Sequence, residues 1–121
     1  MKILIADDSA FMRGILKDIV AKSQWNGAQI IEAVDGKDAV NKFKAETPDL
    51  VLLDIVMPEQ DGIAVLKDIG HSAKSVVIVS SVDQDTVIQE AKGLGARDYI
   101  TKPFNAEQVL TVLNNLLPSG S

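Results

Sequence analysis

Side chains that can do chemistry follow directly after short runs that look like β-strands at four places in this sequence. They are the acids Asp7 and Asp8, the acid Asp54, the hydroxyls of Ser80 and Ser81, and the amine of Lys102. Three carboxylates held within a few ångströms of one another repel, and a hard cation such as Mg²⁺ relieves that repulsion. A carboxylate can also act as a nucleophile, and positive charges facing it stabilise a phosphoryl group during transfer. If the chain folds so that these residues meet, they predict Mg²⁺-dependent transfer of a phosphoryl group to a carboxylate.

The position of each acid suggests its role. Asp54 is the single acid after its apolar run, which favours a nucleophile, whereas the Asp7-Asp8 pair favours metal binding. Lys102 adds a second positive charge. The simpler interpretation of the pair is helix capping, in which Asp8 or Ser9 caps a helix that begins just after them. The presence of Asp54 and Lys102 favours the metal role over capping alone.

Short apolar runs alternate with amphipathic stretches along the chain. Runs of strand length lie at 3–6, 29–34, 50–53, 76–79 and 98–101. Helical periodicity lies at 10–22, 37–45, 63–69, 87–93 and 109–116. The apolar stripe of the first helix includes Phe11, Ile15 and Ile19. Near-continuous apolar strands separated by helices predict an α/β fold with a doubly wound, five-stranded parallel sheet flanked by five helices.

A parallel sheet explains how residues far apart in the sequence meet. The carboxyl ends of its strands lie at one edge, and ligands of open α/β sheets bind outside that edge where the strand order reverses. Asp54, Ser80 and Lys102 all follow predicted strands, so the fold delivers them to the crevice that receives the acidic pair. Trp25, between the first helix and the second strand, is expected at the opposite, amino edge of the sheet.

Composition narrows the other possibilities. The 121 residues fit one domain with a real core, since 46% are hydrophobic and 24% charged, and no cysteine is present for disulfides or thiolate metal sites. A net charge of −5 argues against general binding of nucleic-acid phosphates. No apolar run approaches the roughly 18 residues of a membrane span, and no secretion signal is evident, so the cytoplasm is the expected location. Residues 118–121 have the composition of a flexible tail.

Taken together, these residues resemble the receiver domain of response regulators. The matching motifs are Asp7-Asp8-Ser9, Asp54 followed by Met57-Pro58 and Asp61-Gly62, Ser80, and Lys102-Pro103-Phe104. The resemblance covers residues 1–117, which we expect to form the domain, and residues 8–13 look like receivers of the chemotaxis type. It implies a flavodoxin-like fold with the strand order 2-1-3-4-5.

The resemblance also implies a role for each site residue. Asp54 would accept a phosphoryl group from a histidine kinase, as in two-component signalling. Asp8 and Asp54 would bind Mg²⁺ directly, together with the backbone carbonyl of Val56, while Asp7 would act mostly through bound water. Lys102 would contact the phosphoryl oxygens. The protein would then catalyse only its own phosphorylation and dephosphorylation and would not be an enzyme with a separate substrate.

The switch that the resemblance implies runs from the phosphoryl group to a protein surface. The hydroxyl of Ser80 would hydrogen-bond to the phosphoryl oxygens, and Tyr99 would move inward when it does. The peptide between Lys102 and Pro103 would be cis. The surface built from the fourth helix, the fifth strand and the fifth helix would change shape and bind a target protein or a second copy of the chain.

Two other functions stay open on sequence alone. A metal-dependent phosphohydrolase would share the aspartyl-phosphate chemistry, but such enzymes usually carry an Asp-x-Asp pair after one strand and a cap domain for the substrate. Here the second acid adjoins the first, and 121 residues leave no room for a cap. The other alternative is a receiver-like scaffold that never accepts phosphate, and the complete set of acids with Lys102 argues against it.

Overall fold

A computed structural model describes residues 1–118 of the chain. Within these residues five strands alternate with five helices, as the apolar periodicity predicted. In chain order the elements are β1 Lys2–Ala6, α1 Ala10–Ala21, β2 Gln29–Ala33, α2 Gly36–Glu46, β3 Leu50–Leu53, α3 Gly62–Ile69, β4 Val76–Ser80, α4 Asp85–Gly93, β5 Ala96–Thr101 and α5 Ala106–Leu116. Of the predicted tail 118–121, Pro118 is described and the other three residues lie outside the described part.

The strands of this region form one parallel sheet in the order β2-β1-β3-β4-β5. The α/β class and the flavodoxin-like order are thereby confirmed. β1 pairs with β2 on one side and with β3 on the other, so the chain first adds strands in one direction and then reverses. The reversal lies between β1 and β3, where open α/β sheets bind their ligands. Asp7 and Asp54 are the first residues after these two strands.

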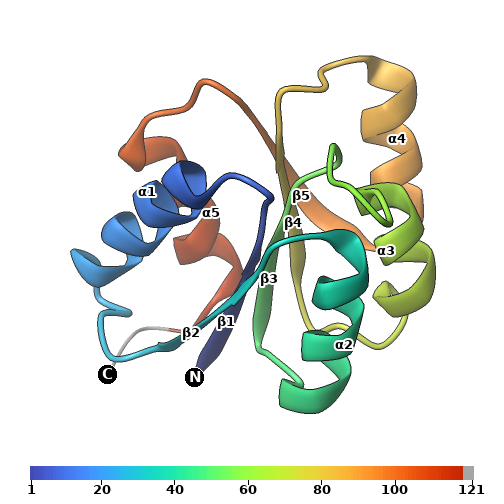
Figure 1. The fold of residues 1–121 in the computed structure, drawn as a ribbon. Coiled ribbons are helices and arrows are strands. Elements are labelled where there is room, and N and C mark those ends of the chain that lie inside the picture. Colours follow the sequence, from blue (N-terminus) through green and yellow to red (C-terminus); the bar gives the residue numbers. More distant parts are fainter. Residues whose placement is uncertain (119–121) are drawn as a thin grey trace.

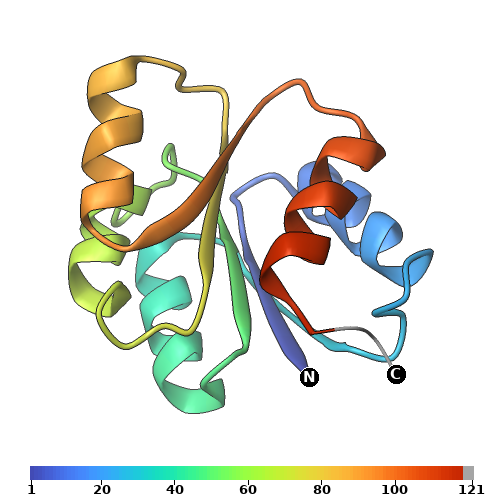
Figure 2. The same ribbon diagram turned by 180° about the vertical axis from the view of Figure 1, so that it is seen from behind.

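Helices cover both faces of the sheet, as Figure 1 and Figure 2 show from opposite sides. α1 and α5 lie on one face, and α2, α3 and α4 lie on the other. Side chains alternate between the faces along a strand, so neighbours in β1 enter different cores. Ile3 and Ile5 pack with α1 and α5, whereas Leu4 and Ala6 pack with the other three helices. Strands buried in this way give the loops at their ends a rigid base.

Capping side chains fix where α1 and α3 begin. Ser9 accepts a hydrogen bond from the backbone N–H of Met12 at the start of α1, and Asp61 accepts one from that of Ala64 at the start of α3. These bonds satisfy N–H groups that have no partner within the helix.

α1 has 12 residues, and none of the helices between residues 1 and 118 is long and apolar enough to cross a membrane.

Several elements begin or end one to three residues away from the predicted ranges, and two differences have a structural reason. Phe11, which the periodicity assigned to the apolar stripe of the first helix, is 78% exposed. It lies in the first turn of α1, whereas the buried residues of that helix, Leu16, Ile19 and Val20, begin one turn later. β5 begins at Ala96, two residues before the predicted run, because Ala96 pairs with Val76 across an irregularity in the register.

Candidate functional site

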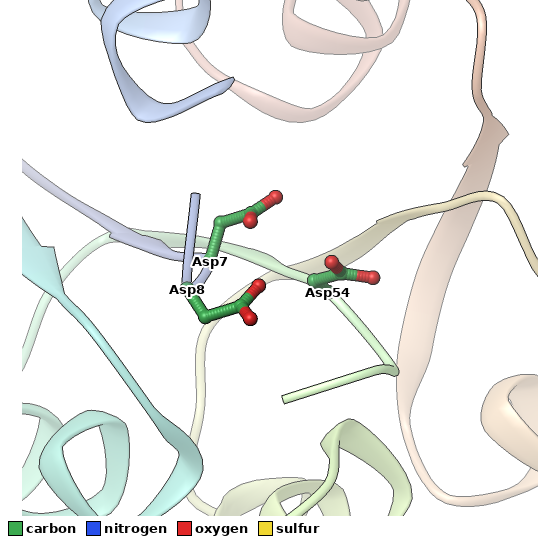
Figure 3. A group of neighbouring side chains, drawn as sticks. All are labelled: Asp7, Asp8 and Asp54. Atoms are coloured by element: carbon green, nitrogen blue, oxygen red, sulfur yellow. The ribbon is translucent and has the colours of Figure 1, made fainter. Parts of the chain in front are cut away.

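Three carboxylates meet at the carboxyl ends of β1 and β3. Oxygens of Asp7, Asp8 and Asp54 all lie within 4.8 Å of one another. Figure 3 shows the three side chains turned toward one space, two from the β1–α1 loop and one from the end of β3. Strand pairing brings them together, because Ala6 pairs with Leu53 and an acid follows each of these residues. The structure therefore unites the acids that the sequence singled out.

Two of the three acids are withdrawn from solvent. Asp7 is 2% exposed and Asp54 is 6% exposed, whereas Asp8 is exposed. Buried carboxylates this close to one another require a counter-charge. Carboxylate oxygens are the donors that Mg²⁺ prefers, and an ion held by a few of them keeps several of its waters. Three carboxylates, of which Asp8 is open to water, therefore fit Mg²⁺. Asp7, Asp8 and Asp54 would hold the ion.

Lys102, just after β5, supplies a counter-charge from the protein itself. Its Nζ donates to Asp7 Oδ2 at 2.9 Å and to Asp54 Oδ2 at 3.2 Å. Burial alone would lower the pKa of Lys102, but the hydrogen bond to Asp7 and the negative charges of Asp54 and Asp7 outweigh it and raise the pKa above its usual value. The ammonium is therefore a permanent positive charge that bridges the two buried carboxylates.

The helix cap and the carboxylate of Asp8 are separate in the β1–α1 loop. Ser9 caps α1 with its hydroxyl, and its backbone N–H donates to Asp7 Oδ1 at 2.8 Å. Asp7 thus shapes the turn while Ser9 begins the helix. The carboxylate of Asp8 takes no part in the cap and faces the other two acids.

The loop between β3 and α3 closes around Asp54. The backbone N–H of Val56 donates to Asp54 Oδ1 at 3.3 Å, and that of Gly62 donates to the carbonyl of Ile55 at 2.8 Å. Gly62 lies so close that a Cβ on it would be 2.2 Å from the Asp54 carbonyl oxygen. These contacts hold the backbone of Val56 beside the carboxylate of Asp54.

Ser80 and Tyr99 lie on neighbouring strands beside the site. Ser80 ends β4 and is fully buried; its hydroxyl oxygen accepts from the backbone N–H of Val82 at 3.3 Å, and its carbonyl accepts from that of Lys102 at 2.9 Å. Tyr99 on β5 is half-buried, and its hydroxyl donates to the carbonyl of Val82. The phenol is therefore already bonded to the loop after β4 in this structure. The peptide between Lys102 and Pro103 is cis, as expected.

Arg13 and Glu32 border the site, and the sequence did not reveal them. Arg13 on α1 donates to the carbonyl oxygen of Asp7 at 2.6 Å and to Glu32 on β2 at 2.9 Å. The two residues are 19 positions apart, and their spacing does not mark them as partners. An Arg on an amphipathic helix and a Glu in a half-exposed strand look like ordinary solvated charges when only the sequence is known.

Known proteins are similar to this chain in sequence and in fold. Residues 3–114 match the family model of the response regulator receiver domain. The chemotaxis protein CheY of Bacillus subtilis is 44% identical over 119 residues, which cover 96% of this chain and 97% of that protein. Among solved structures, the CheX–CheY–BeF3–Mg²⁺ complex of Borrelia burgdorferi matches with a TM-score of 0.87 and 33% identity, covering 98% of this chain and 90% of that chain. The response regulator domain of Thermotoga maritima CheB matches with a TM-score of 0.85 and 35% identity, covering 96% and 95%.

The likeness extends over the whole of the described fold. The residues matched by the family model run from β1 into α5, so they include the sheet and both helical layers. The relatives are also matched over nearly their full length. The family expected from the sequence motifs is confirmed: this chain belongs to the response regulator receiver family and is similar to the CheY proteins of chemotaxis.

Proposed function

We propose that this chain is a phosphorylation-dependent signalling switch in which Asp54 accepts the phosphoryl group of a histidine kinase. The observation that carries the proposal is the bridge that Lys102 makes to Asp7 and Asp54 across a cluster of three carboxylates. Such a site offers a nucleophilic oxygen and two places for positive charge, the ammonium and a bound Mg²⁺. Membership of the receiver family supports the same function.

In the proposed reaction an oxygen of Asp54 attacks the phosphorus of a phosphohistidine. A P–O bond forms as the P–N bond breaks, and the electron pair leaves with the imidazole nitrogen, which takes up a proton from solvent. Bound Mg²⁺ supplies positive charge that offsets the charge on the phosphoryl oxygens. Lys102 supplies the second positive charge, because its shorter bond to Asp7 keeps it anchored while its longer bond to Asp54 is exchanged for a phosphoryl oxygen.

Asp8, Asp54 and the backbone carbonyl of Val56 are the proposed direct ligands of Mg²⁺, with Asp7 acting mostly through water. The different surroundings of the two neighbouring acids support this division. Asp7 already has one oxygen bonded to a backbone N–H and the other to Lys102. Asp8 is exposed, and its carboxylate faces the other acids.

We further propose that residues 1–117 form the working unit and that it acts in the cytoplasm. Its output surface would be α4, β5 and α5, offered to a target protein or to a second copy of the chain. The hydrogen bond from Tyr99 on β5 to the carbonyl of Val82 supports this choice. Val82 lies in the loop that joins Ser80, beside the site, to α4, so the bond links β5 of that surface to this loop. The chain would act on itself and have no separate substrate.

Intact-mass measurement after incubation with a small phosphodonor and Mg²⁺ tests the proposal. We expect wild-type protein to gain one stable phosphoryl group and Asp54→Asn to gain none while staying folded, because an amide is a poor nucleophile. Rapid consumption of the donor without a stable gain would indicate a phosphohydrolase instead. No reaction at all would indicate a scaffold, and full labelling of Asp54→Asn would show that another residue is the acceptor.

A further inference from the structure

Arg13 ties the acidic loop to a neighbouring strand. Its guanidinium Nη1 donates to the carbonyl oxygen of Asp7 at 2.6 Å, and its Nε donates to Glu32 Oε1 on β2 at 2.9 Å. The side chain is 12% exposed, so water competes little for these contacts. A guanidinium holds its donors in one rigid plane, so the bond to Glu32 also sets the direction of the bond to Asp7.

The carbonyl of Asp7 is an effective place to hold this loop. The peptide that joins Asp7 to Asp8 is planar, so a fixed carbonyl oxygen also orients the Cα of Asp8. Asp7 has further anchors of its own, because its N–H donates to the carbonyl of Ala33 at 3.2 Å and its carboxylate accepts from Lys102. Asp8 is exposed, and Arg13 holds the peptide immediately before it.

We infer that Arg13 is a positioning residue for the metal site: it directs the carboxylate of Asp8 by fixing the Asp7–Asp8 peptide, and Glu32 orients Arg13 and offsets its charge. This role rests on the proposed binding of Mg²⁺ by the acidic cluster. The positioning role would extend the site to β2, the outermost strand of the sheet. Glu32 on β2 pairs with Ile5 of β1, which lies only two residues before Asp7.

Because Arg13 is positively charged, a positioning role and simple electrostatics predict opposite effects on Mg²⁺ affinity when the residue is replaced. A guanidinium near a cation site repels the cation, so electrostatics alone predicts that removing the charge strengthens Mg²⁺ binding. Positioning predicts the opposite, because ligands that lose their supporting contacts bind metal less tightly. Lys17 offers a matched control: it lies one turn further along α1 and pairs with the other oxygen of Glu32 at 3.1 Å, not with the acidic loop.

Titration calorimetry of the whole chain with Mg²⁺ measures the effect. We expect Arg13→Gln and Arg13→Lys to bind Mg²⁺ about tenfold more weakly than wild type, the second although it keeps the charge. Glu32→Gln should also bind more weakly, because Arg13 loses the partner that orients it. Lys17→Gln should stay within about twofold of wild type, as expected for an exposed charge. Denaturant unfolding in EDTA shows which variants are folded, and Arg13→Lys provides the test if Arg13→Gln is not.

Either Arg13 variant, folded and binding Mg²⁺ as tightly as wild type or more tightly, overturns this role and leaves the proposed function standing. Failure of wild-type protein to bind Mg²⁺ overturns the metal assignment and the positioning role together. Amide NMR spectra of the metal-free variants give a second readout. Shifts confined to the β1–α1 loop and its contacts support positioning, whereas shifts throughout the sheet show a purely structural role and overturn it.

Discussion

Tyr99 is the single tyrosine of the chain, and its ring lies half-buried against the loop after β4. Burial raises the pKa of its phenol above the usual value, a hydrogen bond with Ser80 counteracts part of this, and the negative charges of Asp54 and Asp83 raise it further. The phenol is therefore within electrostatic reach of the carboxylate that we propose to be phosphorylated. A titration of this one residue reports on the charge of the site.

We predict that Tyr99 ionises above its usual pKa of about 10 in the folded chain, and that Asp83→Asn lowers this pKa. The folded state favours the neutral phenol, so the associated stability is fully present below the pKa of the unfolded chain and is lost as the pH rises through the raised pKa of the folded chain. The ultraviolet absorbance of phenolate follows the titration without interference from other tyrosines.

Asp18→Asn is a matched control for this titration, because Asp18 lies on α1 and pairs there with Lys22. It removes the same charge away from the ring and should leave the pKa of Tyr99 unchanged. A phenol that titrates at the same pH in the folded and the denatured chain would show that the ring is solvated and does not sense the site.

Helix α3 has eight residues, and the way in which the chain enters it decides where Asp54 lies. Asp61 caps the helix, and Gly62 turns its N–H back to the carbonyl of Ile55. Glycine is required at position 62 for close approach, since a Cβ there would lie 2.2 Å from the carbonyl oxygen of Asp54. The start of α3 thus holds Asp54, the proposed acceptor, from the loop side, and the sheet holds it from the strand side.

Gly62→Ala should destabilise the domain by about 1–3 kcal/mol, because the new Cβ would meet the Asp54 carbonyl oxygen at 2.2 Å and the backbone must shift. The same shift should reduce phosphorylation of Asp54. Gly14→Ala provides the control, since Gly14 is exposed on α1 and a Cβ there meets nothing within 4 Å. It should stabilise the domain by roughly 0.5–1 kcal/mol. Denaturant unfolding compares the two, and a neutral Gly62→Ala would refute the close-approach argument.

The secondary structure was readable from the sequence wherever burial on both faces forces a continuous apolar run. β3 occupies the predicted residues 50–53 for this reason. Periodicity was less informative at the ends of elements, because it tells which residues share a helix face but not how far along the helix that face is buried. Phe11 therefore appears in the pattern and yet faces solvent. The early start of β5 depends on an irregular register with β4, which no local pattern encodes.

The site was predictable only to the extent that it follows from strand ends. Asp7, Asp54 and Lys102 each come directly after a strand, so a parallel sheet is enough to bring them together. The pairing of Arg13 with Glu32 is different, because it depends on the directions of two side chains from α1 and β2. Such contacts between elements have no signature in the spacing of residues.

In the molecule as a whole, the candidate site lies at the carboxyl ends of the strands, and the amino ends of the strands serve packing. The acids gather at the carboxyl ends of the strands, whereas Trp25 lies in the segment before β2, at the amino ends. Trp25 is buried in the core beneath α1 and α5, and its indole N–H donates to the carbonyl of Pro118 at 3.0 Å. A five-residue strand spans roughly 16 Å, so the two edges are well apart.

We predict that saturating Mg²⁺ leaves the fluorescence of Trp25 nearly unchanged, because the ion would bind at the far edge of a rigid sheet. Trp25 is the single tryptophan, so the signal is unambiguous. Calorimetry in the same buffer confirms that Mg²⁺ is bound, and denaturant confirms that the fluorescence responds to unfolding. Saturable quenching by Mg²⁺ that disappears in Asp8→Ala would show that the two edges are coupled or that the loop of Trp25 lies near the site.

We propose a path for the signal from the site to the output surface formed by α4, β5 and α5. Phosphorylated Asp54 carries about two negative charges and strong acceptor oxygens. Ser80 is buried at the end of β4 and accepts a bond from Val82, whose carbonyl in turn holds the hydroxyl of Tyr99. A Ser80 hydroxyl that turns to donate to the phosphoryl group would move this loop and, with it, the ring on β5. The surface formed by α4, β5 and α5 would then have one shape with the loop in its present position and another with the loop moved.

We therefore predict that Ser80→Ala leaves Asp54 phosphorylatable but weakens the response of α4, β5 and α5. A tenfold shift between the two shapes requires about 1.4 kcal/mol, and one hydrogen bond to a charged group supplies about 1.5–3 kcal/mol. Beryllofluoride with Mg²⁺ serves as a stable phosphoryl mimic, and the amide NMR shifts that it induces in the three elements measure the response without any partner. Ser81→Ala is the matched control, since Ser81 is the next residue and is exposed. If Ser80→Ala and Tyr99→Ala both retain the wild-type shifts, the signal reaches this surface through other residues.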